Sequence, residues 1–220
     1  MNKKAVILGV IVVAIVAGIA ASVSSSPSET VNLDMGRTHG TISTAMGSAI
    51  LGDPSAPITI VEFGDYQCHQ CYNWFHNTKP AITRDYVETG KVNLVFVDLA
   101  FLGNDSPKAA QASYCAEDQG MYWDYHDLLY NSQEPKIDGG WANSERLKAF
   151  AFSLDLDMKL FESCLDSGKY SKRVQYNIQQ ARDNGVSGTP GFFIVGPDEQ
   201  QQISGAQPFS VFKQILDSMI

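Results

Sequence analysis

The chain has 220 residues, 44% of them hydrophobic, which is enough for one folded domain with a proper core. Its formal net charge is −8 and it contains no basic block, so nucleic acid is not an expected partner, because phosphate binding requires clustered Lys and Arg. The four cysteines are an even number and are compatible with two disulfides in an oxidising compartment.

The N-terminus predicts such a compartment. Lys3 and Lys4 precede an uncharged run of apolar and small residues from 5 to 23. As a helix this run would be roughly 28 Å long, close to the ~30 Å hydrocarbon core of a bilayer. The two lysines would stay on the cytoplasmic side and place the rest of the chain outside. The pattern favours a membrane anchor at residues 1–23, and a cleaved signal peptide is the alternative.

Residues 24–52 are rich in Ser, Thr and Gly and lack a sustained hydrophobic period. We interpret them as a tether, with a short ordered piece near residues 45–51. The folded domain is expected to cover residues 53–220.

Within that domain the sequence predicts an α/β order of strand, helix, strand, a block of helices, a hairpin and a closing helix. Pro80 is expected to break the first helix, because proline removes a backbone donor and its ring clashes with the preceding turn. The block of helices reads as an insertion at about residues 104–168. The predicted elements are strands at 58–63 and 92–99, helices at 68–89, 106–119, 122–130, 144–154, 158–167, 170–184 and 208–219, and a hairpin at 192–203.

Cys68 and Cys71 stand three positions apart where the first strand passes into the first helix. The free N–H groups and the dipole at a helix N-terminus favour a thiolate over a thiol. Thiols in Cys-x-x-Cys pairs have pKa values between about 3.5 and 7, below the ordinary ~8.5. Stabilising the thiolate stabilises the reduced pair, so the disulfide becomes a stronger oxidant. We expect Cys68 to be the exposed nucleophile and Cys71 to be the buried resolving thiol.

A structural disulfide and half of a zinc site are the alternatives for this pair. A zinc site requires four ligands, and the chain has no second Cys-x-x-Cys. His76 lies too far along the helix to join the same ion, whereas His69 could reach it. His69 and Gln70, between the cysteines, are equally suited to tuning the Cys68 thiolate. The sequence therefore favours redox chemistry and no metal.

Glu62 and Thr189-Pro190 are further candidates. Glu62 lies on a strand that should be buried, where its pKa would rise and it could exchange a proton with Cys71. The alternative is a side chain at the strand end that reaches solvent. Pro190 precedes the strand of the hairpin, and local sequence alone indicates only a turn.

Together these motifs resemble the DsbA-like branch of the thioredoxin superfamily. The resemblance covers about residue 52 to the C-terminus. It implies a thioredoxin fold interrupted by a helical domain, a cis Pro190 packed against Cys68 and Cys71, and Thr189 as a backbone partner for an extended substrate. It also implies that Glu62 is a buried acid. The motifs that carry it lie at residues 51–57, 61–68 with Cys71, 119–123 and 185–190.

One departure from the family concerns the residues between the cysteines. The family often has Pro directly after the first Cys and an aromatic residue or His after that. This chain has His69 second and Gln70 third. A donor there can still stabilise the Cys68 thiolate, but the value of the redox potential does not follow from it.

The resemblance implies an extracytoplasmic thiol:disulfide oxidoreductase that introduces disulfides into exported proteins, with no cofactor beyond the Cys68–Cys71 disulfide. Its partners would be reduced or unfolded exported proteins and a membrane redox partner that reoxidises it. We expect a monomer on the outer face of the cell membrane, or a secreted or periplasmic one if the N-terminal segment is cleaved. A reductase or isomerase, or a protein that delivers a soft metal with the same cysteines, are the alternatives.

Cys115 and Cys164 both fall in the helical insertion, and neither has a cysteine close in sequence. A free buried cysteine is a common alternative at such positions. In an oxidising compartment we expect them to form a structural disulfide.

Overall fold

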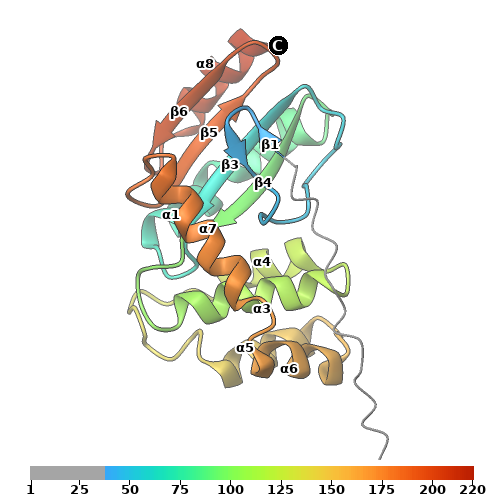
Figure 1. Cartoon of the computed structure of the whole chain (residues 1–220). Coiled ribbons are helices and arrows are strands. Elements are labelled where there is room, and N and C mark those ends of the chain that lie inside the picture. The colour runs from blue at the N-terminus through green and yellow to red at the C-terminus, as the bar shows by residue number, and fades with distance from the viewer. Residues whose placement is uncertain (1–37) are drawn as a thin grey trace, which may run out of the picture. The chain divides into compact units, whose positions relative to one another are not determined.

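The structure is a computed structural model that describes residues 38–220 (Figure 1). The predicted anchor at residues 1–23 and the first part of the predicted tether lie outside the described residues. Between residues 38 and 220, no helix combines the length and the apolar character needed to cross a bilayer.

A four-stranded mixed sheet in the order β4-β3-β5-β6 forms the centre of the fold. β3 runs parallel to β4 and antiparallel to β5, and β5 runs antiparallel to β6. The parallel pair needs a crossover, which helices provide, whereas a short turn joins the antiparallel β5 and β6. The predicted α/β class with strand, crossover and hairpin is confirmed. The strands are β3 (Ile58–Gly64), β4 (Val92–Asp98), β5 (Gly191–Val195) and β6 (Gln200–Ser204).

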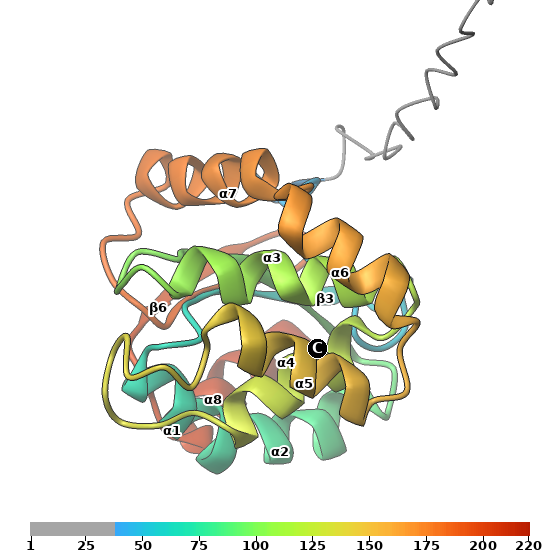
Figure 2. The same cartoon turned by 90° about the horizontal axis from the view of Figure 1, so that it is seen from below.

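The two faces of the sheet carry alternate residues of each strand. Ile58 and Ile60 of β3 join one apolar cluster, and Val61 and Phe63 join another. Figure 2 shows the helices that cover these faces, with α7 on one side and α1, α2 and α8 on the other. These helices are α1 (His69–Asn77), α2 (Lys79–Ile82), α7 (Ser171–Asp183) and α8 (Phe209–Met219).

The crossover from β3 to β4 is broken where Pro80 predicts it. α1 ends at Asn77, Thr78 caps it, and α2 begins at Lys79 with Pro80 in its first turn. Proline is tolerated there because the first N–H groups of a helix have no partner within the helix. A π-helical turn, η1 (Thr83–Val87), continues α2 toward β4.

Four helices lie between β4 and α7, in the places that the apolar spacing predicts. Tyr125, Leu129 and Phe161 of these helices belong to one apolar cluster, and Phe75 of α1 and Phe96 of β4 pack into the same cluster. The helical segment and the active-site end of the sheet therefore share one hydrophobic core. The helices are α3 (Ser106–Glu117), α4 (Tyr122–Asn131), α5 (Ser144–Ser153) and α6 (Met158–Ser167).

The ordered piece predicted near residues 45–51 is present, but it is longer than expected and belongs to the fold. Residues 38–52 pack on the fold, beginning with a small hairpin of β1 (Thr38–His39) and β2 (Ile42–Ser43). The Ser48 N–H donates to the carbonyl of Phe96 at 2.8 Å, and Leu51 exchanges two hydrogen bonds with Leu94. β4 is an edge strand of the main sheet, so its outer N–H and C=O groups need partners, and this segment provides them.

Two buried residues of α7 hold the same segment. The Arg173 Nε donates to the carbonyl of Met46 at 2.9 Å, and its guanidinium also bonds to the carbonyl of Gly47. The Asn177 Nδ2 lies 2.7 Å from the Met46 carbonyl and 2.8 Å from Asp98 Oδ2. Buried carbonyls and carboxylates are costly without a donor, so these contacts favour the ordered segment.

Replacing Asn177 with Ala should lower the free energy of unfolding by about 2–3 kcal/mol, because it leaves buried acceptors of Met46 and Asp98 without this donor. Urea denaturation would measure the loss. Gln179→Ala, on the exposed side of the same helix, is the matched control and should change stability by less than about 0.5 kcal/mol. Equal losses in the two variants would contradict this account of the segment.

Candidate active site

Cys68 and Cys71 lie at the turn from β3 into α1. Cys68 is the N-cap of α1, and its sulfur accepts a hydrogen bond from the backbone N–H of Cys71 at 3.3 Å. Cys71 sits one turn inside the helix and is fully buried, while Cys68 is 6% exposed. Both are free thiols in this structure. Cys68 is more exposed than Cys71, as expected. Cys68 is nevertheless more buried than we expected, because a segment far away in the sequence packs over it.

That segment contains Thr189 and Pro190. The Thr189–Pro190 peptide bond is cis, and the Cys68 thiol donates to the carbonyl of Thr189 at 3.3 Å. Gly191, the next residue, begins β5 and pairs with Phe63 near the end of β3. Strand pairing therefore places Thr189 over Cys68 although the two residues lie 121 positions apart in the chain.

The pKa values of the two thiols are shifted in opposite directions. The pKa of Cys68 is lowered to about 6, first by a hydrogen bond from the Cys71 side chain and then by bonds from Thr189 and from backbone N–H groups, against the effect of burial. Burial raises the pKa of Cys71 well above its ordinary value, and its bond to Cys68 adds to this. At neutral pH the pair is a thiolate at Cys68 beside a fully buried, protonated thiol at Cys71.

Glu62 is buried on β3, with 1% of its surface exposed. Its neighbours across the sheet are Phe96 on β4 and Phe192 on β5, so no strand partner offers a polar group to its carboxyl. Glu62 Oε2 has no hydrogen-bond partner among the described residues. Burial raises the pKa of Glu62 to about 8, the Lys79 ammonium opposes this, and Cys68 adds to it. The side chain does not reach solvent.

His69 and Gln70 are exposed on the first turn of α1. The ring of His69 stacks on Tyr72, with centroids 5.8 Å apart and planes 8° apart. The backbone N–H of Gln70 contributes to lowering the pKa of Cys68. Across residues 38–220, no group of three or more His, Cys, Asp or Glu side chains is arranged to hold a metal ion.

Asp65 is a site residue that the sequence analysis missed. Its carboxylate is buried and accepts hydrogen bonds from the N–H groups of Gln67, Phe101 and Leu102 and from the hydroxyl of Ser106. The Cys68 N–H also donates to the Asp65 carbonyl at 2.9 Å. These bonds fix the turn that presents Cys68. An Asp that precedes a helix cap at a strand end is the signal that could have identified it.

Gln133 from the helical segment also supports this turn. Its side-chain amide donates to the carbonyl of Tyr66 at 2.6 Å and to the carbonyl of Cys68 at 3.1 Å. Such a contact joins residues 65 positions apart or more, so local sequence contains no sign of it.

The chain is similar in sequence and in structure to known proteins. The family described as Thioredoxin matches residues 44–218. The disulfide bond formation protein D of Bacillus subtilis is 30% identical over 151 residues, which cover 67% of this chain and 68% of that protein. A probable disulfide bond formation protein D of Bacillus anthracis is 30% identical over 150 residues, covering 66% and 69%.

Two crystal structures show the same fold. Oxidised BdbD from Bacillus subtilis superposes with a TM-score of 0.74 and 25% identity, over 83% of this chain and 97% of that one. Alpha-DsbA1 from Wolbachia pipientis superposes with a TM-score of 0.67 and 26% identity, over 77% and 89%. The chain belongs to the thioredoxin family. Within it, the chain is a DsbA-like protein-disulfide oxidoreductase.

Cys115 and Cys164 are joined by a disulfide in this oxidoreductase. The bond connects α3 to α6, away from the Cys68–Cys71 pair, and closes a loop with a sequence separation of 49. It therefore braces the helical segment.

The double variant Cys115→Ser/Cys164→Ser should lose about 4 kcal/mol of stability, because opening a loop of this length increases the entropy of the unfolded chain. Thermal unfolding with Cys68 and Cys71 kept reduced would measure the loss. The pKa of Cys68 should stay unchanged, and a shift in it would contradict a bracing role that is separate from the redox pair.

The Cys68 thiolate should titrate with a midpoint near pH 6, followed by absorbance at 240 nm with Cys68→Ser as the blank. The pKa of Cys68 is lower in the folded chain than in the unfolded chain. Ionisation of Cys68 therefore stabilises the reduced fold, fully above about pH 8.5, and this stabilisation is lost as the pH falls through 6. Reduced wild type should therefore exceed reduced Cys68→Ser in melting temperature at pH 8, with the gap closing by pH 5. A midpoint near 9 would show that the turn does not activate Cys68.

Proposed function

We propose that this oxidoreductase introduces disulfides into exported proteins. The observation that carries the proposal is the asymmetry of the pair, in which the thiolate of Cys68 is stabilised and Cys71 is buried and protonated. A stabilised thiolate favours the reduced pair, so the Cys68–Cys71 disulfide accepts electrons from a substrate dithiol. Strongly oxidising members of the superfamily owe their potential to this effect.

In the proposed reaction, a substrate thiolate attacks Cys68 Sγ and the Cys68–Cys71 bond breaks. Cys71 leaves as a thiolate and takes a proton from Glu62, which its raised pKa keeps protonated at neutral pH. A second substrate thiolate then attacks the substrate sulfur of the mixed disulfide. Cys68 leaves as a stable thiolate. Two electrons have passed from the substrate dithiol to the cysteine pair, and the substrate has gained a disulfide.

The surface beside Cys68 supports an unfolded polypeptide as the substrate. The Thr189 backbone lies against Cys68, and an extended substrate segment would pair with it as an added strand. Phe101 is 47% exposed and borders a hollow of about 160 Å³ together with Val186 and Ser187, close to Thr189 in sequence. An exposed aromatic side chain on the border of this hollow suits the apolar residues that unfolded chains present. His69 and Gln70 would tune Cys68 from the rim of the site.

We place this activity outside the cytoplasm, because disulfides persist in oxidising compartments and the N-terminal apolar run follows two lysines. The cysteine pair would be the only redox group, with no bound cofactor. A membrane redox partner would accept the two electrons and restore the disulfide. The protein would act as a monomer, held at the outer face of the membrane, or free if the N-terminal segment is cleaved. Relatives named disulfide bond formation protein D support the formation of disulfides as the reaction.

Mixing the oxidised protein with a reduced, unfolded ribonuclease tests the proposal. We expect one substrate disulfide per Cys68–Cys71 pair consumed, and loss of the reaction in Cys68→Ser. Cys115→Ser/Cys164→Ser is the control and should retain the activity. Equilibration with glutathione should give a potential above about −180 mV, the oxidising side of the superfamily range. A value near −270 mV would identify a reductase, and full activity in Cys68→Ser would overturn the assignment of the site.

A further inference from the structure

The position of Glu62 on β3 determines which helices its side chain faces. Side chains alternate between the two faces of a strand, so Glu62 lies on the same face as Ile58 and Ile60. This is the face covered by α1, α2 and α8. Both of its sheet neighbours are phenylalanines. A charge that compensates this carboxyl must therefore come from a helix on that face.

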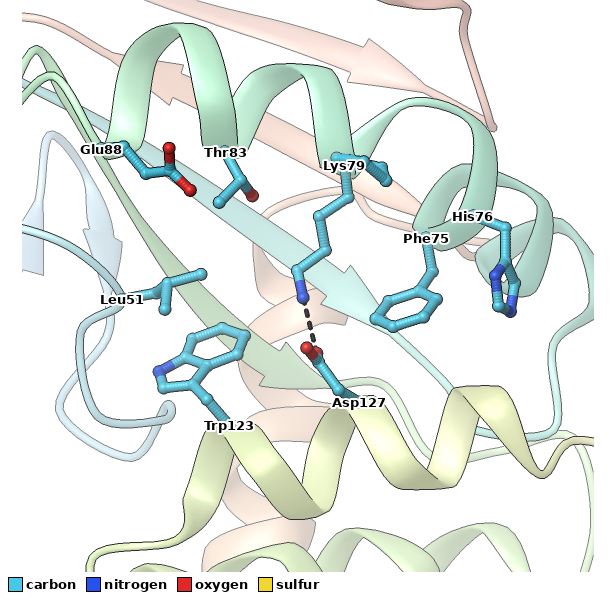
Figure 3. Close-up of a pocket in the computed structure, with 9 residues that line it drawn as sticks. Leu51, Phe75, His76, Lys79, Thr83, Glu88, Trp123 and Asp127 are labelled. Carbon is cyan, nitrogen blue, oxygen red and sulfur yellow. Dashed lines mark hydrogen bonds and ion pairs between the residues drawn. The ribbon is translucent and has the colours of Figure 1, made fainter.

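Lys79, the first residue of α2, provides the positive charge there. Its side chain is 8% exposed, and its ammonium lies 4.6 Å from the ring centre of Phe75 and 5.4 Å from that of Trp123. The ammonium does not bond to Glu62 in this structure. It pairs instead with Asp127 Oδ1 on α4, at 2.6 Å (Figure 3). The Lys79–Asp127 pair thus joins α2, which packs on the sheet, to α4 of the helices between β4 and α7.

A cavity of about 390 Å³ gives this pair access to solvent. Phe75 and Trp123 form part of its wall, and Asp127 is 47% exposed at the pair. Figure 3 shows the Lys79 and Asp127 side chains reaching toward each other across the cavity from α2 and α4. The ammonium therefore pairs with the Asp127 carboxylate at the solvent-exposed side, and its positive charge also favours ionisation of the buried Glu62 carboxyl.

The other titratable groups around Glu62 carry no compensating positive charge. His126 on α4 is buried and its pKa is lowered well below the ordinary value by burial, so the ring is neutral. Tyr66 and Tyr130 have raised pKa values and are neutral as well. Cys68 contributes a negative charge when it is a thiolate, and Cys71 is protonated. His76 and Glu88 also border the cavity beside Lys79.

We propose that Asp127 is a positioning residue for the exchange reaction: it holds the Lys79 ammonium on the cavity side and limits how much of that charge reaches Glu62. The strength of the Lys79–Asp127 pair then sets the pH at which Glu62 gives its proton to Cys71. The inference rests on the exchange reaction proposed above. The competing explanation is that the ion pair only fastens α4 to α2.

The two explanations differ in the sign of the effects. Removing the Asp127 charge by Asp127→Asn frees the ammonium to act on Glu62, which lowers the pKa of Glu62. Removing the ammonium by Lys79→Met raises it. Charges separated by several ångströms in a protein interior shift a pKa by about half a unit or more. A fastening role predicts a loss of stability in both variants and no opposite shifts.

The test is a direct titration of Glu62 in the reduced full chain by ¹³C-carboxyl NMR, with Glu62→Gln to assign the signal. We expect the midpoint to fall by at least about half a pH unit in Asp127→Asn and to rise by a similar amount in Lys79→Met. Asp166→Asn is the matched control, because it removes the carboxylate of another Lys–Asp pair, at 2.8 Å from Lys148, and it should leave the midpoint unchanged.

The double variant Lys79→Met/Asp127→Asn separates a direct effect of Asp127 from one that acts through Lys79. If Asp127 acts through Lys79, the double variant titrates like Lys79→Met. Three results for the Glu62 midpoint would overturn the proposal. Asp127→Asn could shift it by the full amount in the Lys79→Met background, both single variants could shift it in the same direction, or neither could shift it. The titration does not measure disulfide exchange. It can therefore contradict the role of Asp127 while the proposed oxidation of substrates stands, and the oxidation assay can fail while the role of Asp127 stands.

Discussion

The antiparallel pairing of β5 with β3 is the constraint on which the site depends. β3 ends in the turn that presents Cys68, and β5 begins directly after the cis Pro190. The register that matches Phe63 with Gly191 places the Thr189 carbonyl 3.3 Å from the Cys68 sulfur. A shift of one residue would send alternate side chains to the wrong face of the sheet, so burial of the strand also maintains the geometry of the site.

Burial acts differently on each ionisable group in this region. Cys68 lies at a helix N-terminus, where N–H groups stabilise its charged form. Cys71 lies one turn deeper, where a backbone hydrogen bond at Asp65 offsets only part of the cost of burying a charge. Glu62 is buried among aromatic rings, so its pKa rises into the range in which thiols exchange protons. At neutral pH Cys68 is therefore a thiolate while the neighbouring Cys71 and Glu62 hold their protons, so a proton donor stands ready beside the buried thiol.

The helical segment does more than cover the sheet. Its core includes Phe75 and Phe96 of the thioredoxin part, so the two parts are packed as one unit around the redox pair. Asp65 accepts from the loop that leads into α3, and Gln133 donates to the turn that presents Cys68. The disulfide between α3 and α6 holds these two helices together. The contacts of Asp65 and Gln133 therefore maintain the geometry of Cys68, whereas the disulfide braces the helices at a distance from it.

The sequence by itself determined the local features. Apolar runs predict the strands, Pro80 predicts the break in the first helix, and the spacing of Cys68 and Cys71 at a strand-to-helix junction predicts their chemistry, because each depends on residues close in the chain. The resemblance to the family added Pro190 and Glu62. Only the tertiary structure decided the roles of Asp65 and Gln133, the packing of residues 38–52 on β4 and α7, and the pairing of Lys79 with Asp127. These depend on contacts between residues that lie far apart in the chain, and such contacts leave no periodic or spacing signal in a single sequence.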